Sequence, residues 1–517
     1  MRRRLRMAWV IDHFSRVAKQ RDKGRGMNRC FLGVVLTLGV LLVQGSLSLE
    51  AGPAAKEVSQ GQNTSQPRGM LEATKFHGSL MGMQYETWFT PGNANWDTGE
   101  AIPILGKYSS YDVSIIRKHA EWFNELGINW LLVDWSNMLW MKPDWEQHTG
   151  ATHELEETTE LLLKTYSQMS TEGKDTPKIV LLLGLYNGVP VSDPMKRLNG
   201  IFAWLTKNYL SRSEYKDLWL YYNGKPLITV LFNPADPCKE LKDYEKPAPL
   251  DAPQWTVRWM ASQLQINHAE SCGMWSWMDG TIRQLVTYHD GSPEETVVTP
   301  SCFAEGGWLA TTATGRDHGA PYIESWKVAF EARPKFIQIH QWNEFAGQKE
   351  GEGYGPDHHV YVDEYNLESS DDIEPTRLEE CAYRGCGGWG YYYMNLTKAL
   401  ISLYRHETPG ITVVALSAPF QTELVRQNHL ALTWQTIGES PKSYDVQLDG
   451  NTAARAIQGT KYTLDLSRVH PGSHSVTLLA NGVHTFFDLN PERVTVRSTV
   501  PLPVTSTIHF SYSPDSR

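Results

Sequence analysis

The sequence is short of the residue patterns that bind metals and phosphates. It has six cysteines in 517 residues, and no pair of them has the CxxC spacing of a zinc site. It contains no HExxH motif, no G-x-S-x-G turn around a nucleophilic serine and no Gly-rich phosphate loop. Asp357-His358-His359 could ligate a metal, but this run is more typical of a solvated loop. We therefore expect no metal and no cofactor.

A hydrophobic run long enough to cross a bilayer is also missing. Residues 31–43 are uncharged and apolar, but a membrane helix needs roughly 20 such residues. Residues 1–29 hold ten Lys/Arg and two Asp/Glu. A basic stretch, a short apolar run and then small residues are typical of a secretory signal. Residues 1–48 therefore predict a secreted or periplasmic protein. Met27 is a second possible start that would leave residues 1–26 untranslated, and an uncleaved membrane anchor is the alternative.

Positive charge is scarce in the part of the chain that remains after export. The whole sequence carries a net charge of −10 and residues 1–29 contribute +8, so the mature chain carries about −18. Such an acidic protein is a poor partner for nucleic acid. Aromatic residues are plentiful instead, with 19 Trp and 23 Tyr. Because flat rings stack on sugars, this aromatic content favours binding of a poly- or oligosaccharide. We also expect a monomer that is not inserted in a membrane once the signal is removed.

Five cysteines remain after export. Cys381 and Cys386 are close enough in sequence to close a small loop, and Cys272 with Cys302 is a second possible pair. Cys238 is the fifth. Spacing alone leaves the connectivity open.

Residues 49–78 are rich in Gly, Ser, Gln, Ala and Thr and are predicted to be a flexible leader, with order beginning near residue 80. Residues 79–408 alternate between apolar runs of strand length and helical patterns. The predicted strands are residues 81–89, 128–136, 178–186, 226–232, 274–280, 296–302 and 335–345. The predicted helices are residues 112–126, 154–169, 193–209, 256–264, 322–332 and 396–404. An eighth strand is either 359–365 or 389–393.

This alternation predicts an α/β fold of the (β/α)8 TIM-barrel type. A doubly wound open sheet is the alternative, but it would normally carry a Gly-rich phosphate turn after its first strand. Residues 409–517 change to short runs that alternate apolar and polar residues, at 429–435, 443–450, 461–466 and 474–482. This pattern predicts an all-β sandwich similar to fibronectin type III domains, with Trp434 in its core.

Carboxylates at the ends of the predicted strands are the candidate catalytic groups. In (β/α)8 barrels, catalytic residues sit at the C-terminal ends of strands, and glycosidases use pairs of carboxylates. The predicted catalytic residues are Glu344, Glu368, Asp134 and Asp279. The predicted substrate-binding residues are Glu86, Trp88, Trp135, Trp277, Trp342, Asn343, His340, Asp363 and Asp372. For each carboxylate taken alone, a helix cap or a salt bridge is the alternative role.

The segment Gln341-Trp342-Asn343-Glu344-Phe345, followed by Asp372-Ile373-Glu374-Pro375, resembles the Trp-Asn-Glu-Trp … Glu-Pro signature of the glycoside hydrolase family 71/99-like barrels. A closer resemblance is to secreted bacterial proteins labelled xylosidase/arabinosidase. It rests on Val362-Asp363, Glu368 and Tyr391–Tyr393 in the same order. The resemblance implies that Glu344 is the central catalytic carboxylate.

Two positions depart from the family pattern. Gly347 stands where family 99 enzymes have a second Glu, and Asp371 stands where the closer relatives have Arg. The second carboxylate is therefore expected from Glu368 or Asp372. The prediction is a secreted glycoside hydrolase. A non-catalytic glycan-binding protein on a degenerate barrel, which Gly347 favours, and a transglycosylase are the alternatives, and the sandwich would be a spacer or a glycan-binding module.

Overall fold

The computed structural model describes most of the chain from residue 69 onward. The described residues are 69–91, 95–136, 147–186, 193–232, 250–261, 273–278, 280–302, 314–345, 366–383, 385–405, 410–418 and 424–514. The predictions for residues 1–48, Cys238, Cys272, Asp279, Gly347, Asp357–His359 and Asp363 lie outside these ranges. The described ranges all belong to one compact unit, Ser65–Arg517.

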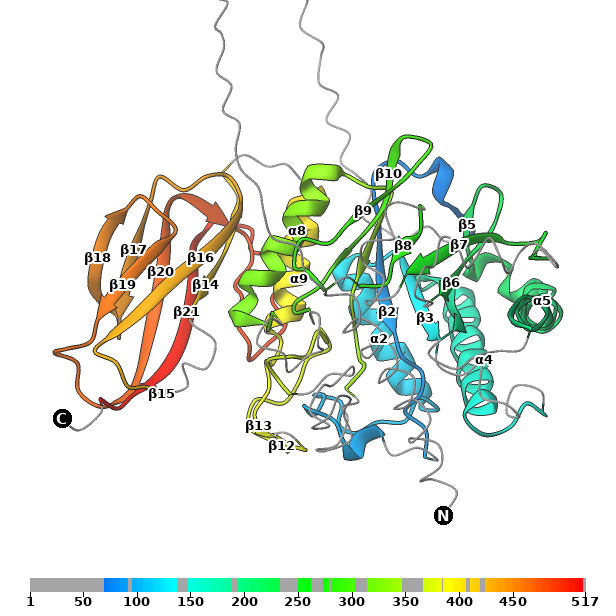
Figure 1. Ribbon diagram of the computed structural model, residues 1–517, viewed down its shortest axis with the longest axis horizontal. Coiled ribbons are helices and arrows are strands. Elements are labelled where there is room, and N and C mark those ends of the chain that lie inside the picture. The colour runs from blue at the N-terminus through cyan, green and yellow to red at the C-terminus, as the bar shows by residue number, and fades with distance from the viewer. Residues whose placement is uncertain are drawn as a thin grey trace, which may run out of the picture. The chain divides into compact units, whose positions relative to one another are not determined.

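A run of parallel strands forms the centre of the N-terminal region, which is mixed α/β (Figure 1). These strands are β2 (Leu80–Tyr85), β3 (Trp130–Trp135), β4 (Lys178–Tyr186), β6 (Lys225–Phe232), β7 (Thr256–Ala261), β8 (Trp275–Ser276), β10 (Ser292–Val298) and β11 (Phe336–Ile339). Each pairs in parallel with its neighbour in the order β10-β11-β2-β3-β4-β6-β7-β8. At the two ends of this order, the Ser276 backbone N–H on β8 donates to Glu295 on β10 at 3.1 Å.

Three short strands complete this 11-stranded sheet, and they are β1 (Leu71–Glu72), β5 (Leu220–Tyr222) and β9 (Val286–His289). β1 pairs with β5, so ordered structure begins before residue 80, inside the expected leader. A hairpin of β12 (Cys381–Ala382) and β13 (Gly385–Cys386) is closed by the Cys381–Cys386 disulfide, which confirms that pairing. The possible partner of Cys302, Cys272, lies outside the described residues.

The helix predicted at residues 256–264 is wrong, because Thr256–Ala261 is strand β7. Val257 lies opposite Ile228 and Trp259 opposite Val230 in a parallel ladder with β6. Thr, Val and Trp favour a strand at these positions, and pairing with β6 and β8 outweighs a weak helical spacing.

Strand β7 also answers the question of the missing parallel strand. Of the two segments considered for it, residues 359–365 lie outside the described ranges, and residues 389–393 lead into a helix that begins at Tyr392. The missing strand therefore lies, in sequence, between the predicted strands 226–232 and 274–280, and not after the seventh predicted strand.

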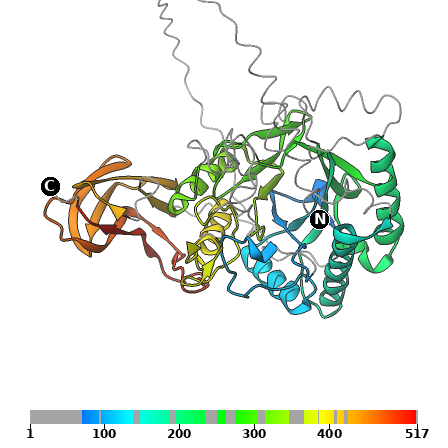
Figure 2. The same ribbon diagram turned by 60° about the horizontal axis from the view of Figure 1, so that its bottom comes forward.

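Five longer helices lie on the outside of the parallel strands (Figures 1 and 2). They are α2 (Val113–Leu126), α4 (Gly150–Thr171), α5 (Pro194–Leu205), α8 (Ala320–Ala332) and α9 (Tyr392–Arg405). Short 3-10 turns occupy Ala73–Lys75, Asn95–Asp97, Ser213–Leu218 and Asp317–Gly319, and a π turn occupies Thr206–Leu210. Across the described ranges, no helix has both the length and the apolar character that crossing a membrane requires.

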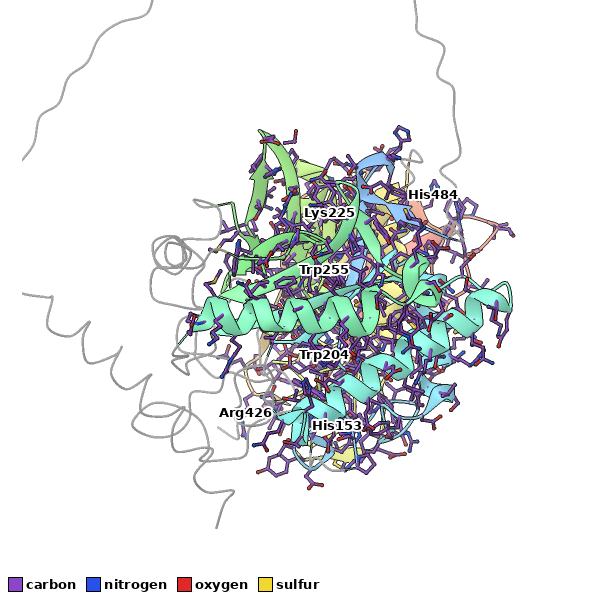
Figure 3. The ribbon with its side chains drawn as sticks, turned by 90° about the vertical axis from the view of Figure 1, so that its right-hand side faces the viewer. His153, Trp204, Lys225, Trp255, Arg426 and His484 are labelled. Carbon is purple, nitrogen blue, oxygen red and sulfur yellow. A yellow bond between two sulfur atoms is a disulfide. The ribbon has the colours of Figure 1, made fainter. Side chains whose placement is uncertain are left out.

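The predicted start and stop of α2 are confirmed. The Asp112 side chain accepts the Ser114 backbone N–H at 2.8 Å, and Gly127 ends the helix with a φ of 81°, a conformation that glycine adopts without strain. Figure 3 shows α4 and α5 side by side, with His153 on α4 and Trp204 on α5.

Side chains alternate between two apolar clusters along the parallel strands. One cluster lies on the face of the strands that points away from the helices, and it includes Leu80, Trp130 and Phe336. The other includes Met83 and Val133 and packs against the helices. Gly82 permits the first cluster, because a Cβ atom at residue 82 would lie 2.2 Å from the Trp130 ring.

The C-terminal region is all-β and has two sheets. One sheet contains β14 (Thr412–Ser417), β16 (His429–Gly438) and β19 (Lys461–Asp465). The other contains β15 (Leu424–Val425), β17 (Ser443–Leu448), β18 (Asn451–Ile457), β20 (Gly472–Thr485) and β21 (Leu502–Tyr512). One apolar cluster joins both sheets and includes Trp434, which is 1% exposed, so its predicted core position is confirmed.

Strand β14 belongs to two cores at once. Val414 and Leu416 join the cluster between the two C-terminal sheets. Val413 and Ala415, on the opposite face of the same strand, join the cluster that includes the helices of the N-terminal region. The two regions therefore share this strand.

Candidate active site

Two carboxylates lie next to each other where strands β2 and β3 end. In the β2–β3 ladder Gly82 pairs with Trp130 and Gln84 with Leu132. Because side chains alternate along a strand, the next residues on the same face are Glu86 and Asp134. That face is the one that carries Leu80 and Trp130, between the strands. Glu86 is 2% exposed and Asp134 is 6% exposed.

The side chain of Gln84 links these two carboxylates. Its Nε2 atom lies 3.3 Å from Glu86 Oε1 and 3.1 Å from Asp134 Oδ2. The two oxygens can therefore be no farther apart than the sum of these distances. Glycosidase carboxylate pairs are roughly 5–5.5 Å apart in retaining enzymes and roughly 6.5–9.5 Å apart in inverting ones. This upper limit lies below the inverting range, so the two distances allow the separation of a retaining pair but not that of an inverting one.

Asp134 is poised to carry a proton. Burial raises the pKa of Asp134 to about 6, while hydrogen bonds from Ser136 act in the opposite direction. One of these is the Ser136 backbone N–H, which donates to Asp134 Oδ1 at 2.5 Å. A carboxyl group with such a pKa is partly protonated in mildly acidic to neutral solution, so it can act as a general acid.

Glu344 is half-buried in a turn that Asp372 holds in place. The two carboxylate oxygens of Asp372 accept the backbone N–H groups of Glu344 at 2.5 Å and of Phe345 at 2.9 Å. Gln341 Nε2 donates to the Glu344 carboxylate. Asp372, predicted to touch substrate, is 0% exposed and fixes the backbone of the turn, while the Glu344 side chain has an amide donor beside it.

Asn343 holds the end of strand β2. Its Oδ1 accepts the Glu86 backbone N–H at 2.9 Å, and its Nδ2 donates to the Glu86 backbone carbonyl at 3.1 Å. The same Nδ2 donates to the Tyr108 hydroxyl at 2.9 Å. Asn343 therefore positions Glu86 and is itself positioned by Tyr108.

Behind Asn343 lies a buried carboxylate that sequence reasoning did not include among the site residues. Glu374 is 0% exposed, accepts the Tyr108 hydroxyl at 2.7 Å and lies 3.1 Å from His119 Nε2. His119 Nδ1 in turn lies 3.1 Å from the Tyr85 hydroxyl. The sequence signal for Glu374 is the Asp372-Ile373-Glu374-Pro375 segment, which ends the acidic run 363–374.

His340 follows strand β11 and is 0% exposed. Burial lowers its pKa to about 3. Asp371 Oδ2 lies 3.4 Å from His340 Nδ1 and would favour the charged form, but complete burial dominates, so the imidazole is neutral. Its ring meets the Trp277 ring edge-on, with centroids 4.4 Å apart.

The tryptophans divide into two groups. Trp342 is 0% exposed and packs against Phe123 of α2 at 4.8 Å between ring centroids. Trp135 is 1% exposed and donates to Thr159 of α4. This placement corrects the expectation that these two rings stack on sugar, because both point outward into the helix layer. Trp88 and Trp277 are partly exposed and stay candidates.

Glu368 is half-buried and fixes a neighbouring segment. Its Oε1 accepts the Asp317 backbone N–H at 2.7 Å, and its backbone carbonyl accepts the Arg316 N–H at 2.9 Å. A catalytic role for Glu368 stays a prediction. The predictions for Asp279 and Asp363 fall outside the described ranges. Within those ranges no group of three or more His, Cys, Asp or Glu side chains is arranged to hold a metal ion.

No family model and no curated protein matches the chain. Among solved structures, it is similar to the family 99 endo-α-mannosidase from Bacteroides thetaiotaomicron, with 16% identity, a TM-score of 0.42, and coverage of 63% of this chain and 97% of that chain. A glycoside hydrolase-like protein has 11% identity and a TM-score of 0.39, with coverage of 63% of this chain and 94% of that chain. The endo-β-1,4-mannanase from Thermotoga petrophila has 10% identity and a TM-score of 0.30, with coverage of 86% of this chain and 100% of that chain. Such values are too low to assign an activity, and the resemblance to proteins labelled xylosidase/arabinosidase stays a prediction.

Proposed function

We propose that the chain is an exported glycoside hydrolase that cleaves a poly- or oligosaccharide. The parallel strands would close into a (β/α)8 barrel, which the unbroken order from β10 to β8 and the bond from Ser276 to Glu295 support. The mouth of the barrel would then hold the carboxylates that follow β2, β3 and β11. The C-terminal sheets would form a fibronectin type III-like sandwich that acts as a spacer or a glycan-binding module.

One observation carries this proposal. Asp134 is a buried carboxyl group with a pKa raised to about 6, and it shares the Gln84 amide with a second buried carboxylate, Glu86. Hydrolysis of a glycosidic bond needs one carboxyl group that protonates the leaving oxygen and another that acts as nucleophile or base. Its raised pKa suits Asp134 to the first of these roles, which leaves the second to Glu86 or to Glu344 beyond the end of the neighbouring strand β11.

We assign Asp134 as the general acid and Glu344 as the nucleophile or base. The amide donor that Gln341 presents to Glu344 suits a negatively charged oxygen. Glu86 would orient the sugar beside Asp134, with Asn343 holding its backbone.

The test compares the mature chain, residues 49–517, with its Glu344→Gln variant on mannans, xylans, arabinans and sulfated polysaccharides, measuring new reducing ends. We expect release by the wild type and a fall of at least about 100-fold in the variant. Glu121→Gln is the matched control, because Glu121 is an exposed glutamate on α2, and it should keep full activity. Near-normal activity of Glu344→Gln in a folded protein would end the assignment.

The assay also distinguishes the alternatives. Products larger than the substrate at high sugar concentration would identify a transglycosylase. Binding of a glycan with no cleavage by the wild type would identify a non-catalytic barrel.

A further inference from the structure

Several buried polar atoms at the ends of β2 and β11 make no hydrogen bond within the described part of the chain. They are Gln84 Oε1, Gln338 Oε1, Gln341 Oε1 and both ring nitrogens of His340. The residues are at most 1% exposed. A buried polar atom without a partner destabilises a folded protein, and native structures contain few of them. So many in one place indicate a site built for an occupant that supplies the missing hydrogen bonds.

The residues of this group, which we call the acceptor cluster (Gln84, Gln338, His340 and Gln341), are neighbours. Gln338 pairs with Gly82 in the β2–β11 ladder, and the Trp342 N–H continues the contact by donating to the Gln84 carbonyl at 3.0 Å. Paired strands lie about 4.8 Å apart. By alternation Gln84, Gln338 and His340 point to the same side, between the strands, and the cluster adjoins Asp134 through the Gln84 amide.

The chemistry of the cluster is that of a hydrogen-bond acceptor. The free glutamine atoms are carbonyl oxygens, which can only accept. A neutral imidazole has one N–H donor and one acceptor. Because Asp371 Oδ2 lies 3.4 Å from His340 Nδ1, we assign the proton to Nδ1, which leaves Nε2 as an acceptor. The complement of such a surface is a set of hydroxyl donors.

The surroundings are unfavourable to an anion. Glu86 lies beside the Gln84 amide, and Asp134 adds a second negative charge there when it has lost its proton. Like charges close together repel strongly in a buried site. Arg316, a cation that donates to Ser370 and to the Asp372 carbonyl, is 3% exposed. Its Nε and Nη1 make no hydrogen bond within the described residues, but the guanidinium is enclosed by the Trp389 ring at 3.8 Å and the Tyr393 ring at 4.4 Å and is shielded from solvent.

We propose that the acceptor cluster binds the hydroxyl groups of an uncharged sugar ring and excludes sugars that carry a carboxylate or a sulfate. This inference rests on the glycosidase function proposed above and narrows its substrate class. The Trp277 ring, which is partly exposed and packs against His340, would lie at the edge of the same sugar subsite.

The first experiment measures binding to the Glu344→Gln variant by calorimetry, so that turnover does not interfere. The ligands are matched pairs, namely manno-oligosaccharides against mannuronate oligosaccharides and galacto-oligosaccharides against galacturonate oligosaccharides. We expect a neutral member to bind at least about tenfold more tightly than its acidic counterpart. Equal or tighter binding of the acidic members would overturn the inference.

The second experiment replaces His340 with Phe. The Phe ring can keep the packing on Trp277, and the polar contact that it removes is the 3.4 Å approach of His340 Nδ1 to Asp371. We expect His340→Phe to melt at about the wild-type temperature and to bind the neutral sugar about tenfold more weakly. His153→Phe, at an exposed histidine of α4, is the control that should change neither. Retained sugar binding in His340→Phe would show that the cluster does not contact the sugar.

Gln338→Met is a second variant in case His340→Phe does not fold, and it should weaken binding of the same neutral sugar. If the protein cleaves only acidic glycans, the proposed hydrolase function stands and the inference of an uncharged sugar is overturned. Binding of neutral sugars with no cleavage would overturn the hydrolase and keep the inference. Neither binding nor cleavage of any glycan would overturn both.

Discussion

Two polar clusters lie within the parallel strands, and they differ in how completely their groups are paired. At the start of β10, Glu294 accepts hydrogen bonds from Arg258 at 2.8 Å, from the Trp275 ring N–H at 2.7 Å and from the Tyr222 hydroxyl at 2.7 Å. At the ends of β2 and β11, the acceptor cluster keeps several polar atoms unbonded within the described residues. Complete pairing serves stability, whereas incomplete pairing marks a place that awaits a ligand.

The charge states of the two carboxylates follow the same division. Burial alone would raise the pKa of Glu294, but Arg258 and the other donors outweigh it and lower that pKa. Burial raises the pKa of Asp134 to about 6, with no cation among the causes. A carboxyl group is thus an ionised structural anchor at one end of the strands, and at the other end it is one that can hold a proton up to about pH 6.

The largest effect that we expect comes from replacing Asp134, the carboxyl group beside the acceptor cluster. Asp134→Asn keeps the shape of the side chain but cannot donate the proton. Activity should fall by about 10²–10⁴-fold, which is the usual contribution of a positioned general acid. The measurement is kcat/KM on the glycan that the wild type cleaves. A fall of less than about threefold would assign the proton to another residue.

The second prediction concerns the fully paired cluster around Glu294. Glu294→Gln leaves Arg258, whose side chain is only 14% exposed, without its ion partner. Breaking a buried ion pair costs about 3–5 kcal/mol, so urea unfolding should show a loss of free energy of that order. Activity per folded molecule should stay close to the wild-type value, in contrast to Asp134→Asn. A large loss of activity in folded Glu294→Gln would remove the distinction between the two ends.

The third and smallest prediction is a pH dependence. Because the folded pKa of Asp134 is about 6 and its unfolded pKa is about 4, the folded state binds the proton more tightly. Its contribution to stability is complete below about pH 4 and is lost as pH rises through about 6, which amounts to about 3 kcal/mol. Asp134→Asn lacks this loss, so its advantage over the wild type, measured as the difference in unfolding free energy, should grow from pH 4 to pH 7. An advantage that does not change with pH would contradict the burial of Asp134.

The activity of the wild type should respond to the same proton. A general acid must be protonated, so kcat/KM should decline as pH rises above about 6. A rise over the same range would give Asp134 the role of base.

Much of the fold follows from local patterns in the sequence. Asp112 and Gly127 delimit α2 because their chemistry acts within one turn of the helix. The identity of strand β7 depends on its neighbours β6 and β8, which no local spacing reveals. The same limit explains why β14, shared by two cores, was not recognised as a strand.

The candidate site was predicted in part for a similar reason. Carboxylates after apolar runs identified Glu86, Asp134 and Glu344. Sequence could not say which way a ring points, so Trp135 and Trp342 were expected at the sugar although both face the helices. Nor could it show that Glu374, distant in sequence from Tyr108, lies 2.7 Å from the Tyr108 hydroxyl.

The sharing of β14 between two cores constrains how this protein can be divided. Removing the chain from residue 410 onward would take Val413 and Ala415 out of the cluster that also contains the helices α2 and α9, and so would expose apolar surface on the remaining part. The two regions should accordingly melt as one cooperative unit. For evolution and for engineering alike, the C-terminal sheets are then an inseparable part of the N-terminal region and not an interchangeable module.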